Sequence, residues 1–226
     1  MSAPKLGLVE GFFGPEWSWI ARQHMVHVLG LNRGDFYFYA PKRDRFLRKG
    51  WSENHLTAEW NELKLLRDIC RESHVHFGLG LSPFEIHENW STKTKELLKN
   101  KICKLEELDF DILGLFFDDM KGSSDLAEKQ IEIVGFVQNQ TKKKILFCPT
   151  YYSFDPILDK VFGERPAQYL DLIGSHISAD VDVLWTGQKV ISPTITENDL
   201  QEVAKILKRK PFVWDNFFAN DGPKQC

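Results

Sequence analysis

The sequence predicts an α/β fold in which parallel strands curl into a barrel. Seven short apolar runs alternate with segments of helical periodicity, and the loops between them are short. Such alternation indicates parallel strands joined by right-handed crossovers. Polar residues follow the first, second, fourth, fifth and seventh runs, and only a ring would bring all these strand ends to one mouth. We therefore expect a (β/α)8 barrel of the TIM type, although its eighth strand is missing from this chain.

The length and the charge of the chain limit what such a barrel could do. Its 226 residues suffice for one sizeable core, so we expect residues 1–226 to form a single domain, either truncated at the C-terminus or closed by something else. The formal net charge of -3 shows no basic excess, which argues against a nucleic-acid partner. A neutral polar partner fits better, and some of the aromatic residues could stack on sugar rings.

The cysteines and the N-terminus indicate a reducing compartment. Cys70, Cys103, Cys148 and Cys226 are widely spaced and form no C-x-x-C pair, so we expect reduced, buried thiols instead of a zinc or redox motif. The N-terminus shows no signal-peptide pattern, and no apolar run is long enough to span a bilayer. We therefore expect a cytoplasmic protein, or a nuclear one in a eukaryotic cell, without a membrane partner.

A glycine-rich loop follows the first expected strand, residues 6–10. Residues Gly11 to Trp17 place two glycines around two aromatic side chains. Glycine permits tight backbone geometry, so a main-chain carbonyl or amide in this loop could approach a ligand closely. A helix then runs from Trp17 or Ser18 to about Leu29.

A lysine occupies the comparable position after the second expected strand, residues 35–39. Pro41 stops that strand and leaves Lys42 in the following loop, at the level where ligands bind to a barrel. A lysine in a loop is usually solvated, so Lys42 indicates a site only together with other residues. Residues 45–56 are basic and irregular, and we interpret them as a loop over the rim of the pocket.

The fourth expected strand carries the most informative pattern. After a helix at 57–73, a strand at 76–81 and another helix, residues 112–117 are mostly large and apolar with no polar alternation, as in a strand buried on both faces. The run ends in Asp118 and Asp119. Ligands bind at the carboxyl ends of parallel strands, so two adjacent acids there predict an active site. A surface turn is the alternative.

The last three expected strands and the helices between them repeat the alternation. Tyr151 and Tyr152 follow the first of these strands and are either packing at the rim or hydroxyl donors into the pocket. The pattern is weak from residue 154 to 174, where two prolines limit helix length. A capping box at 196–199 predicts the start of the last helix. The three strands are expected at residues 144–148, 181–187 and 211–214.

The spacing of the two acids restricts their chemistry. Neighbouring Cα atoms lie about 3.8 Å apart, so Asp118 and Asp119 would approach a substrate from one side. They could not straddle a sugar as the ordinary retaining pair does, with carboxyls about 5–5.5 Å apart. In glycoside hydrolysis the substrate's own 2-acetamido group could attack instead, with one acid binding its N–H and the other protonating the leaving oxygen. A Mg²⁺ site also fits this spacing.

Six segments in a fixed order carry a family resemblance. They are VEGFFG with Trp17, YFYAPK, FFDD, FCPTYY, VLWTGQKVIS and WDNFFAND, and they extend from about Leu6 to Asp221. Together they resemble the catalytic domain of family 84 glycoside hydrolases, the O-GlcNAcases and related β-N-acetylglucosaminidases. The resemblance implies hydrolysis of O-linked GlcNAc from serine or threonine of proteins, with retention through an oxazoline intermediate and without a cofactor or metal.

The resemblance also implies roles for individual residues. Asp118 would orient and polarise the acetamido group, and Asp119 would be the general acid and base. Tyr152 would hydrogen-bond the acetamido oxygen, and Trp214 would form a wall of its pocket. The remaining contacts to the sugar would come from the backbone of Gly11 and from Lys42, Asn216 and Asp221.

The chain departs from the usual family pattern at three positions. Arg43 stands where the family often has Asp, Phe84 where it has Gly, and Tyr151 where it has Glu, which would alter the rim. The missing eighth strand would also remove a sugar-binding asparagine of the family. The alternatives are therefore a catalytically weak or inactive barrel that binds GlcNAc, and a hexosaminidase acting on glycans or hyaluronan fragments. An open barrel edge would also allow the chain to form homo-oligomers.

Overall fold

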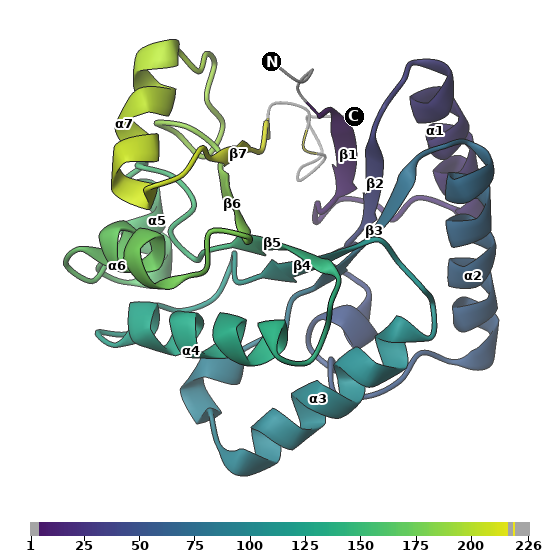
Figure 1. The fold of residues 1–226 in the computed structure, drawn as a ribbon, viewed down its shortest axis with the longest axis horizontal. Helices are drawn as coiled ribbons and strands as arrows, with labels where there is room; N and C mark the ends of the chain where they lie inside the picture. Colours follow the sequence, from purple (N-terminus) through teal and green to yellow (C-terminus); the bar gives the residue numbers. More distant parts are fainter. Residues whose placement is uncertain (1–4, 217–218, 220–226) are drawn as a thin grey trace.

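Seven parallel strands form one curled sheet, and the helices cover its outer side (Figure 1). The computed structural model describes residues 5–216 and residue 219. In this part of the chain every strand pairs with its neighbour in the sequence, in the order β1-β2-β3-β4-β5-β6-β7. The expected α/β fold with parallel strands is confirmed. The strands are β1 (Gly7–Glu10), β2 (Phe36–Tyr39), β3 (His76–Leu81), β4 (Ile112–Phe116), β5 (Lys144–Cys148), β6 (Asp182–Trp185) and β7 (Phe212–Val213).

Polar caps mark the beginnings of several helices. Ser18 Oγ accepts a hydrogen bond from the Ala21 N–H, and Thr196 forms the expected capping box with Asp199. The helices are α1 (Trp19–Leu31), α2 (Thr57–Glu72), α3 (Thr92–Glu106), α4 (Leu126–Gln138), α5 (Ile157–Phe162), α6 (Tyr169–His176) and α7 (Glu197–Leu207), with short 3-10 helices η1 (Arg45–Leu47) and η2 (Ile86–Asn89). None of these described helices has the length and apolar character needed to cross a bilayer.

Aromatic side chains fill the inside of the curl. Measured between ring centroids, Phe38 lies 5.6 Å from Phe36 and 6.1 Å from Phe116. Phe116 in turn lies 5.8 Å from Trp214, which follows β7. A Cβ on Gly114 would lie 2.6 Å from the Phe116 ring, so only glycine fits beside that ring on β4. The stack therefore joins β2, β4 and the end of β7 across the interior.

The two outer strands of the sheet lie on either side of an opening in the curl (Figure 1). Among the described residues, β1 pairs with β2 alone and β7 pairs with β6 alone. Side chains nevertheless meet across this region, because the rings of Phe36 and Phe212 lie 5.7 Å apart. The described strands thus form a half-barrel with two unpaired edges.

Three elements differ in detail from expectation. The weak stretch at 154–174 contains two short helices, α5 and α6. Pro156 is the N-cap of α5, a position where the missing N–H and fixed φ of proline do not obstruct a helix. The last strand is shorter than the expected 211–214, and the irregular stretch at 45–56 contains η1.

The expectation of buried thiols is correct for two cysteines and wrong for one. Cys70 and Cys148 are free and buried, in α2 and β5 respectively. Cys103 is free but exposed on α3, because its position on that helix faces away from the core positions Leu98, Ile102 and Leu105. Cys226 lies outside the described residues.

The packing of α6 against α7 depends on Gly174. A Cβ there would lie 2.5 Å from the Ile206 carbonyl oxygen and 2.6 Å from the Leu207 Cα, so α7 would have to move. We expect Gly174→Ala to lower the free energy of unfolding by about 1–3 kcal/mol, the usual cost of overpacking. The control Gly135→Ala on α4, where a Cβ would have no atom within 4 Å, should raise it by about 0.5–1 kcal/mol. Urea unfolding measures both, and a loss of equal size in the two variants would contradict this account.

Candidate active site

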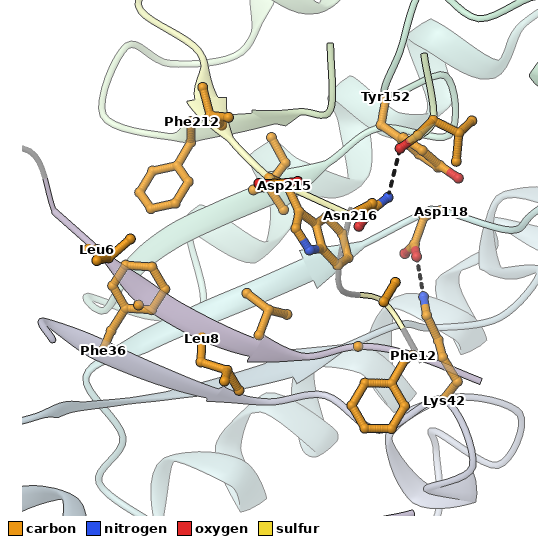
Figure 2. Close-up of a pocket in the computed structure, with 18 of the residues that line it drawn as sticks. Leu6, Leu8, Phe12, Phe36, Lys42, Asp118, Tyr152, Phe212, Asp215 and Asn216 are labelled. Atoms are coloured by element: carbon orange, nitrogen blue, oxygen red, sulfur yellow. Dashed lines mark hydrogen bonds and ion pairs between the residues drawn. The ribbon is translucent and has the colours of Figure 1, made fainter. Parts of the chain in front are cut away.

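A cavity of about 560 Å³ lies at the carboxyl ends of the strands and continues between β1 and β7 (Figure 2). Its lining includes all the expected site residues that the structure describes. These are Gly11, Lys42, Asp118, Asp119, Tyr152, Trp214 and Asn216, which come from the segments after β1, β2, β4, β5 and β7. The remaining expected residue, Asp221, lies outside the described part of the chain.

Lys42 is buried between the two acids. Its Nζ donates a hydrogen bond to Asp118 Oδ2, as Figure 2 shows, and lies 3.4 Å from Asp119 Oδ2. Burial on its own lowers the pKa of Lys42, but the carboxylates of Asp118 and Asp119 outweigh burial and raise the pKa above its ordinary value. With an exposed fraction of 8%, Lys42 is part of the cavity and not a solvated loop residue.

The two acids have different environments. Asp118 is 4% exposed, and its Oδ1 makes no hydrogen bond to any described residue. The Asp119 side chain is 25% exposed, and its φ of 60° is a left-handed conformation that Asp tolerates. Burial, followed by the charge of Asp118, raises the pKa of Asp119 to about 6 although Lys42 lowers it. The site therefore contains one carboxyl that keeps its proton up to about pH 6.

Gly11 and Trp214 form adjacent parts of the cavity wall. A Cβ on Gly11 would lie 3.1 Å from the Trp214 ring and 3.3 Å from the Val9 side chain, which is closer than ordinary contact. Glycine therefore allows the indole to lie against the backbone that follows β1. Asn216, two residues after the indole, donates from Nδ2 to the Val190 carbonyl at 3.2 Å (Figure 2).

The structure separates the two adjacent tyrosines. Tyr152 lines the cavity and is 8% exposed. Tyr151 is fully buried outside the lining, where its hydroxyl donates to the Gly163 carbonyl at 2.6 Å and its ring meets Tyr169 edge-on. Tyr151 is thus a packing residue, and Tyr152 is the tyrosine that can reach a ligand.

A buried polar network that sequence reasoning missed joins the ends of β4 and β5. Thr150 Oγ1 donates to the Phe117 carbonyl at 2.8 Å and accepts from Gln130 Nε2 at 2.8 Å. Tyr169 donates to Gln130 and accepts from the Thr150 N–H at 3.0 Å. Because these groups satisfy one another, the network fixes the backbone directly before Asp118. A glutamine in an amphipathic helix gives no sequence signal for such a role.

The position between the acids suits an ammonium group more than a metal ion. Within the described residues, no group of three or more His, Cys, Asp or Glu side chains is placed to hold a metal. The space that a Mg²⁺ ion would need between Asp118 and Asp119 contains Lys42 Nζ instead.

Comparison with known proteins gives the family. A family model described as beta-N-acetylglucosaminidase matches residues 6–226. The chain belongs to this family. The resemblance of its six segments to family 84 glycoside hydrolases is thereby confirmed.

Individual members of the family are similar over almost the whole chain. The chain is 31% identical over 227 residues to Protein O-GlcNAcase of Rattus norvegicus and, likewise, of Mus musculus, which covers 95% of this chain and 24% of each relative. A mutant of the Thermobaculum terrenum O-GlcNAc hydrolase has a similar structure, with a TM-score of 0.84, 30% identity, and coverage of 96% of this chain and 48% of that one. The chain thus spans 24% of the length of these curated relatives.

The pKa of Asp119 predicts a pH dependence of stability. A carboxyl whose pKa rises to about 6 on folding stabilises the fold below its unfolded pKa, and this contribution is lost as the pH rises through about 6. Asp119→Asn has no carboxyl to titrate and so does not lose stability in this way. The free energy of unfolding of the variant minus that of the unchanged chain should therefore increase by about 2–3 kcal/mol between pH 4 and pH 8. Urea unfolding at several pH values measures the difference. The control Asp180→Asn, at an exposed position, should show little change, and a pH-independent effect of Asp119→Asn would contradict the prediction.

Proposed function

We propose that this chain forms the catalytic part of a retaining exo-β-N-acetylglucosaminidase that removes O-linked GlcNAc from serine or threonine of proteins. The observation that carries the proposal is the position of Asp118 and Asp119 on the same cavity, with Lys42 between them. Adjacent acids cannot act from opposite faces of a sugar, which favours an attacking group that belongs to the substrate. The family and the names of the relatives support GlcNAc linked to protein as the substrate.

Asp118 accepts the acetamido N–H of the substrate in this mechanism. Its Oδ2 already binds Lys42, whereas its Oδ1 is buried without a described partner. Leaving a buried acceptor unpaired costs about 1–3 kcal/mol, and an N–H from the acetamido group would remove that cost. The same hydrogen bond would direct the acetamido oxygen toward the anomeric carbon and make it more nucleophilic.

Asp119 transfers a proton in both steps. In the first, the acetamido oxygen bonds to the anomeric carbon while the bond to the leaving oxygen breaks, and Asp119 gives its proton to that oxygen. In the second, Asp119 takes a proton from water as the water oxygen attacks the anomeric carbon, and the oxazolinium ring, whose N–H stays hydrogen-bonded to Asp118, opens to the acetamide. Two inversions give retention, and a pKa of about 6 suits a group that donates and then accepts.

The other cavity residues would hold the sugar. The Tyr152 hydroxyl would donate to the acetamido oxygen, and the Trp214 ring would form a wall against the acetamido methyl. Lys42 has three N–H donors, of which the acids use two, so the third is available to a sugar hydroxyl. Further contacts would come from the backbone of Gly11 and from Asn216 and Asp221.

Residues 1–226 would act as one (β/α)8 barrel domain once an eighth strand pairs between β1 and β7. That strand would come from elsewhere in the protein or from a second copy of this chain, which would make the enzyme a homo-oligomer. Unpaired strand edges are templates for such pairing. A structure of the full protein checks this: both edges paired with an eighth strand would support it, and direct pairing of β1 with β7 would overturn it.

The compartment proposed for the enzyme is the cytoplasm, or the nucleus in a eukaryotic cell. The free thiols of Cys70, Cys103 and Cys148 are consistent with reducing conditions. Fractionation of cells with an antibody to the protein would test the assignment, and recovery in a secreted fraction would contradict it.

The deciding experiment compares aryl glycosides that differ only at C2. An aryl N-acetyl-β-glucosaminide should be hydrolysed with retention, and a trifluoroacetamido analogue should react at least about tenfold more slowly because its carbonyl oxygen is a weaker nucleophile. The corresponding aryl glucoside should not react. Equal rates on the glucoside and the glucosaminide would contradict substrate assistance, and tight binding of an oxazoline mimic without any turnover would indicate a binding barrel.

Two variants separate the roles of the acids. Asp119→Asn should lower kcat by about 10²–10⁴-fold for a poor leaving group, and by much less for a leaving group that needs no proton. Asp118→Asn should lower kcat for both leaving groups, because it weakens the attack itself. For the unchanged enzyme, kcat/KM should fall as the pH rises above about 6, where Asp119 loses its proton. Identical leaving-group dependence in the two variants would refute the assignment.

A further inference from the structure

A row of alternating cations and aromatic rings begins beside the acids with Lys42 and Phe13, which line the cavity, and continues beyond the lining to Arg48, Phe84 and Lys49. The ring centre of Phe13 lies 5.6 Å from Lys42 Nζ and 5.3 Å from the guanidinium carbon of Arg48. The same guanidinium carbon lies 4.8 Å from the ring of Phe84, and Lys49 Nζ lies 5.9 Å from that ring. All four contacts are within the range of cation–π attraction. We call Lys42, Phe13, Arg48, Phe84 and Lys49 the rim ladder.

Arg48 is a buried cation whose charge acts on Asp119 but which makes no direct ion pair with an acid of the described chain. It is 7% exposed, its Nε makes no hydrogen bond, and it forms no ion pair with any described residue. Burying a charge is costly unless it is paired, and aromatic faces compensate only in part. The guanidinium fork is moreover the side-chain group best shaped to bind a carboxylate. The guanidinium of Arg48 in the rim ladder could therefore bind an additional anion.

The acids at neighbouring positions of these loops do not form ion pairs with Arg48. Asp44 accepts hydrogen bonds from backbone N–H groups of η1 and from Tyr39, and it also contacts His55. Glu53 pairs with Arg45. Glu85, next to Phe84 in the sequence, is exposed and forms no ion pair among the described residues. The rim beside the acid pair therefore has an excess of positive charge.

We propose that the rim ladder binds acidic side chains of the peptide that flanks the GlcNAc-bearing serine or threonine. This inference rests on the proposed function, in which the peptide is the leaving group and departs next to Asp119. The ladder begins there, because Lys42 contacts Asp119 and Phe13 lines the same cavity. Phe13, which is 41% exposed, offers an apolar face to the peptide chain, and Arg48 and Lys49 bind its carboxylates.

The protonation of Asp119 strengthens this preference. When Asp119 holds its proton, Lys42 keeps only the carboxylate of Asp118, and Arg48 loses the nearby negative charge of Asp119. Burial and Asp118 raise the pKa of Asp119, and Arg48 is among the cations that lower it. A bound carboxylate would offset the effect of Arg48 and so favour the protonated form with which the first step begins.

The test uses O-GlcNAc peptides of equal length whose residues beside the modified serine are acidic, neutral or basic. For the full protein, kcat/KM of the acidic peptide should exceed that of the neutral one by about fivefold, and the basic peptide should be poorest. The preference should shrink in 0.5 M NaCl, where charges are screened within a few ångströms. An aryl N-acetylglucosaminide, which has no peptide, is measured in parallel as the test of the proposed function itself.

Three variants assign the preference to the ladder. Arg48→Gln and the exposed Lys49→Ala should each lower the acidic-to-neutral ratio by about threefold, mainly through KM, because these charges bind the peptide and do not act on the reacting atoms. Arg48→Lys keeps the charge and should retain part of the ratio. Lys49→Ala keeps the test informative if the Arg48 variants fold poorly. The control Lys64→Ala removes an exposed charge from α2 and should leave the ratio unchanged.

The possible results separate this inference from the function on which it rests. If the aryl substrate is hydrolysed but the three peptides react equally, the rim ladder does not bind acidic peptides selectively. The same conclusion follows if Lys49→Ala and both Arg48 variants leave the acidic-to-neutral ratio of kcat/KM unchanged. If GlcNAc attached to a glucuronate-containing oligosaccharide is hydrolysed faster than the acidic peptide, the ladder serves an anionic glycan and the peptide assignment is overturned. If neither the aryl substrate nor any peptide is hydrolysed, the proposed function fails and the inference fails with it.

Discussion

The buried ammonium group of Lys42 is the interaction on which the site depends. Two adjacent carboxyls at a strand end repel each other, and neither is easily buried without a partner. Lys42 follows β2, whereas the acids follow β4, and β3 lies between these strands. In a flat sheet the two strand ends would be about 10 Å apart, since neighbouring strands are spaced by about 4.8 Å. The curl of the sheet turns the ends toward each other, so its curvature and the protonation of Asp119 are physically linked.

Buried polar networks hold the strand ends from which the functional loops begin. The guanidinium of Arg22 in α1 donates to Glu10 through Nε at 2.9 Å and Nη2 at 2.8 Å, and Tyr37 donates to the same carboxylate. This network anchors the last residue of β1, directly before Gly11. On the other side of the cavity, Thr150 links the end of β5 to the carbonyl before Asp118. Both networks are costly to disturb because their members are buried and paired, and both lie outside the cavity, so the cavity residues can be polar without weakening the fold.

The sequence was informative wherever a residue's role follows from its place along a strand, and uninformative wherever it depends on packing between elements. The uninterrupted apolar run before Asp118 predicted a buried strand, and the capping box at Thr196 predicted a helix start, because both signals are local. Family resemblance was needed to prefer Tyr152 over Tyr151, since the two differ only in which side of the loop each ring packs. The aromatic partners of Arg48, Phe13 and Phe84, come from two separate loops, so no periodicity could have brought them together.

The cavity and the open edges of the sheet are parts of one arrangement. Trp214 lies against the backbone of Gly11 on one side and stacks near Phe116 on the other, directly after the short strand β7. The same cavity that contains the acids also reaches Leu8 and Phe212, on the two unpaired strands. The position of Trp214 therefore depends on the contacts that β7 makes with its surroundings, because a strand of two residues has little stiffness of its own. The wall proposed for the acetamido group thus depends on what packs at the edge of the sheet, whereas the acids follow β4 at the centre of the sheet, away from that edge. The closure proposed for the sheet should for this reason affect binding of the sugar more strongly than it affects the protonation of Asp119.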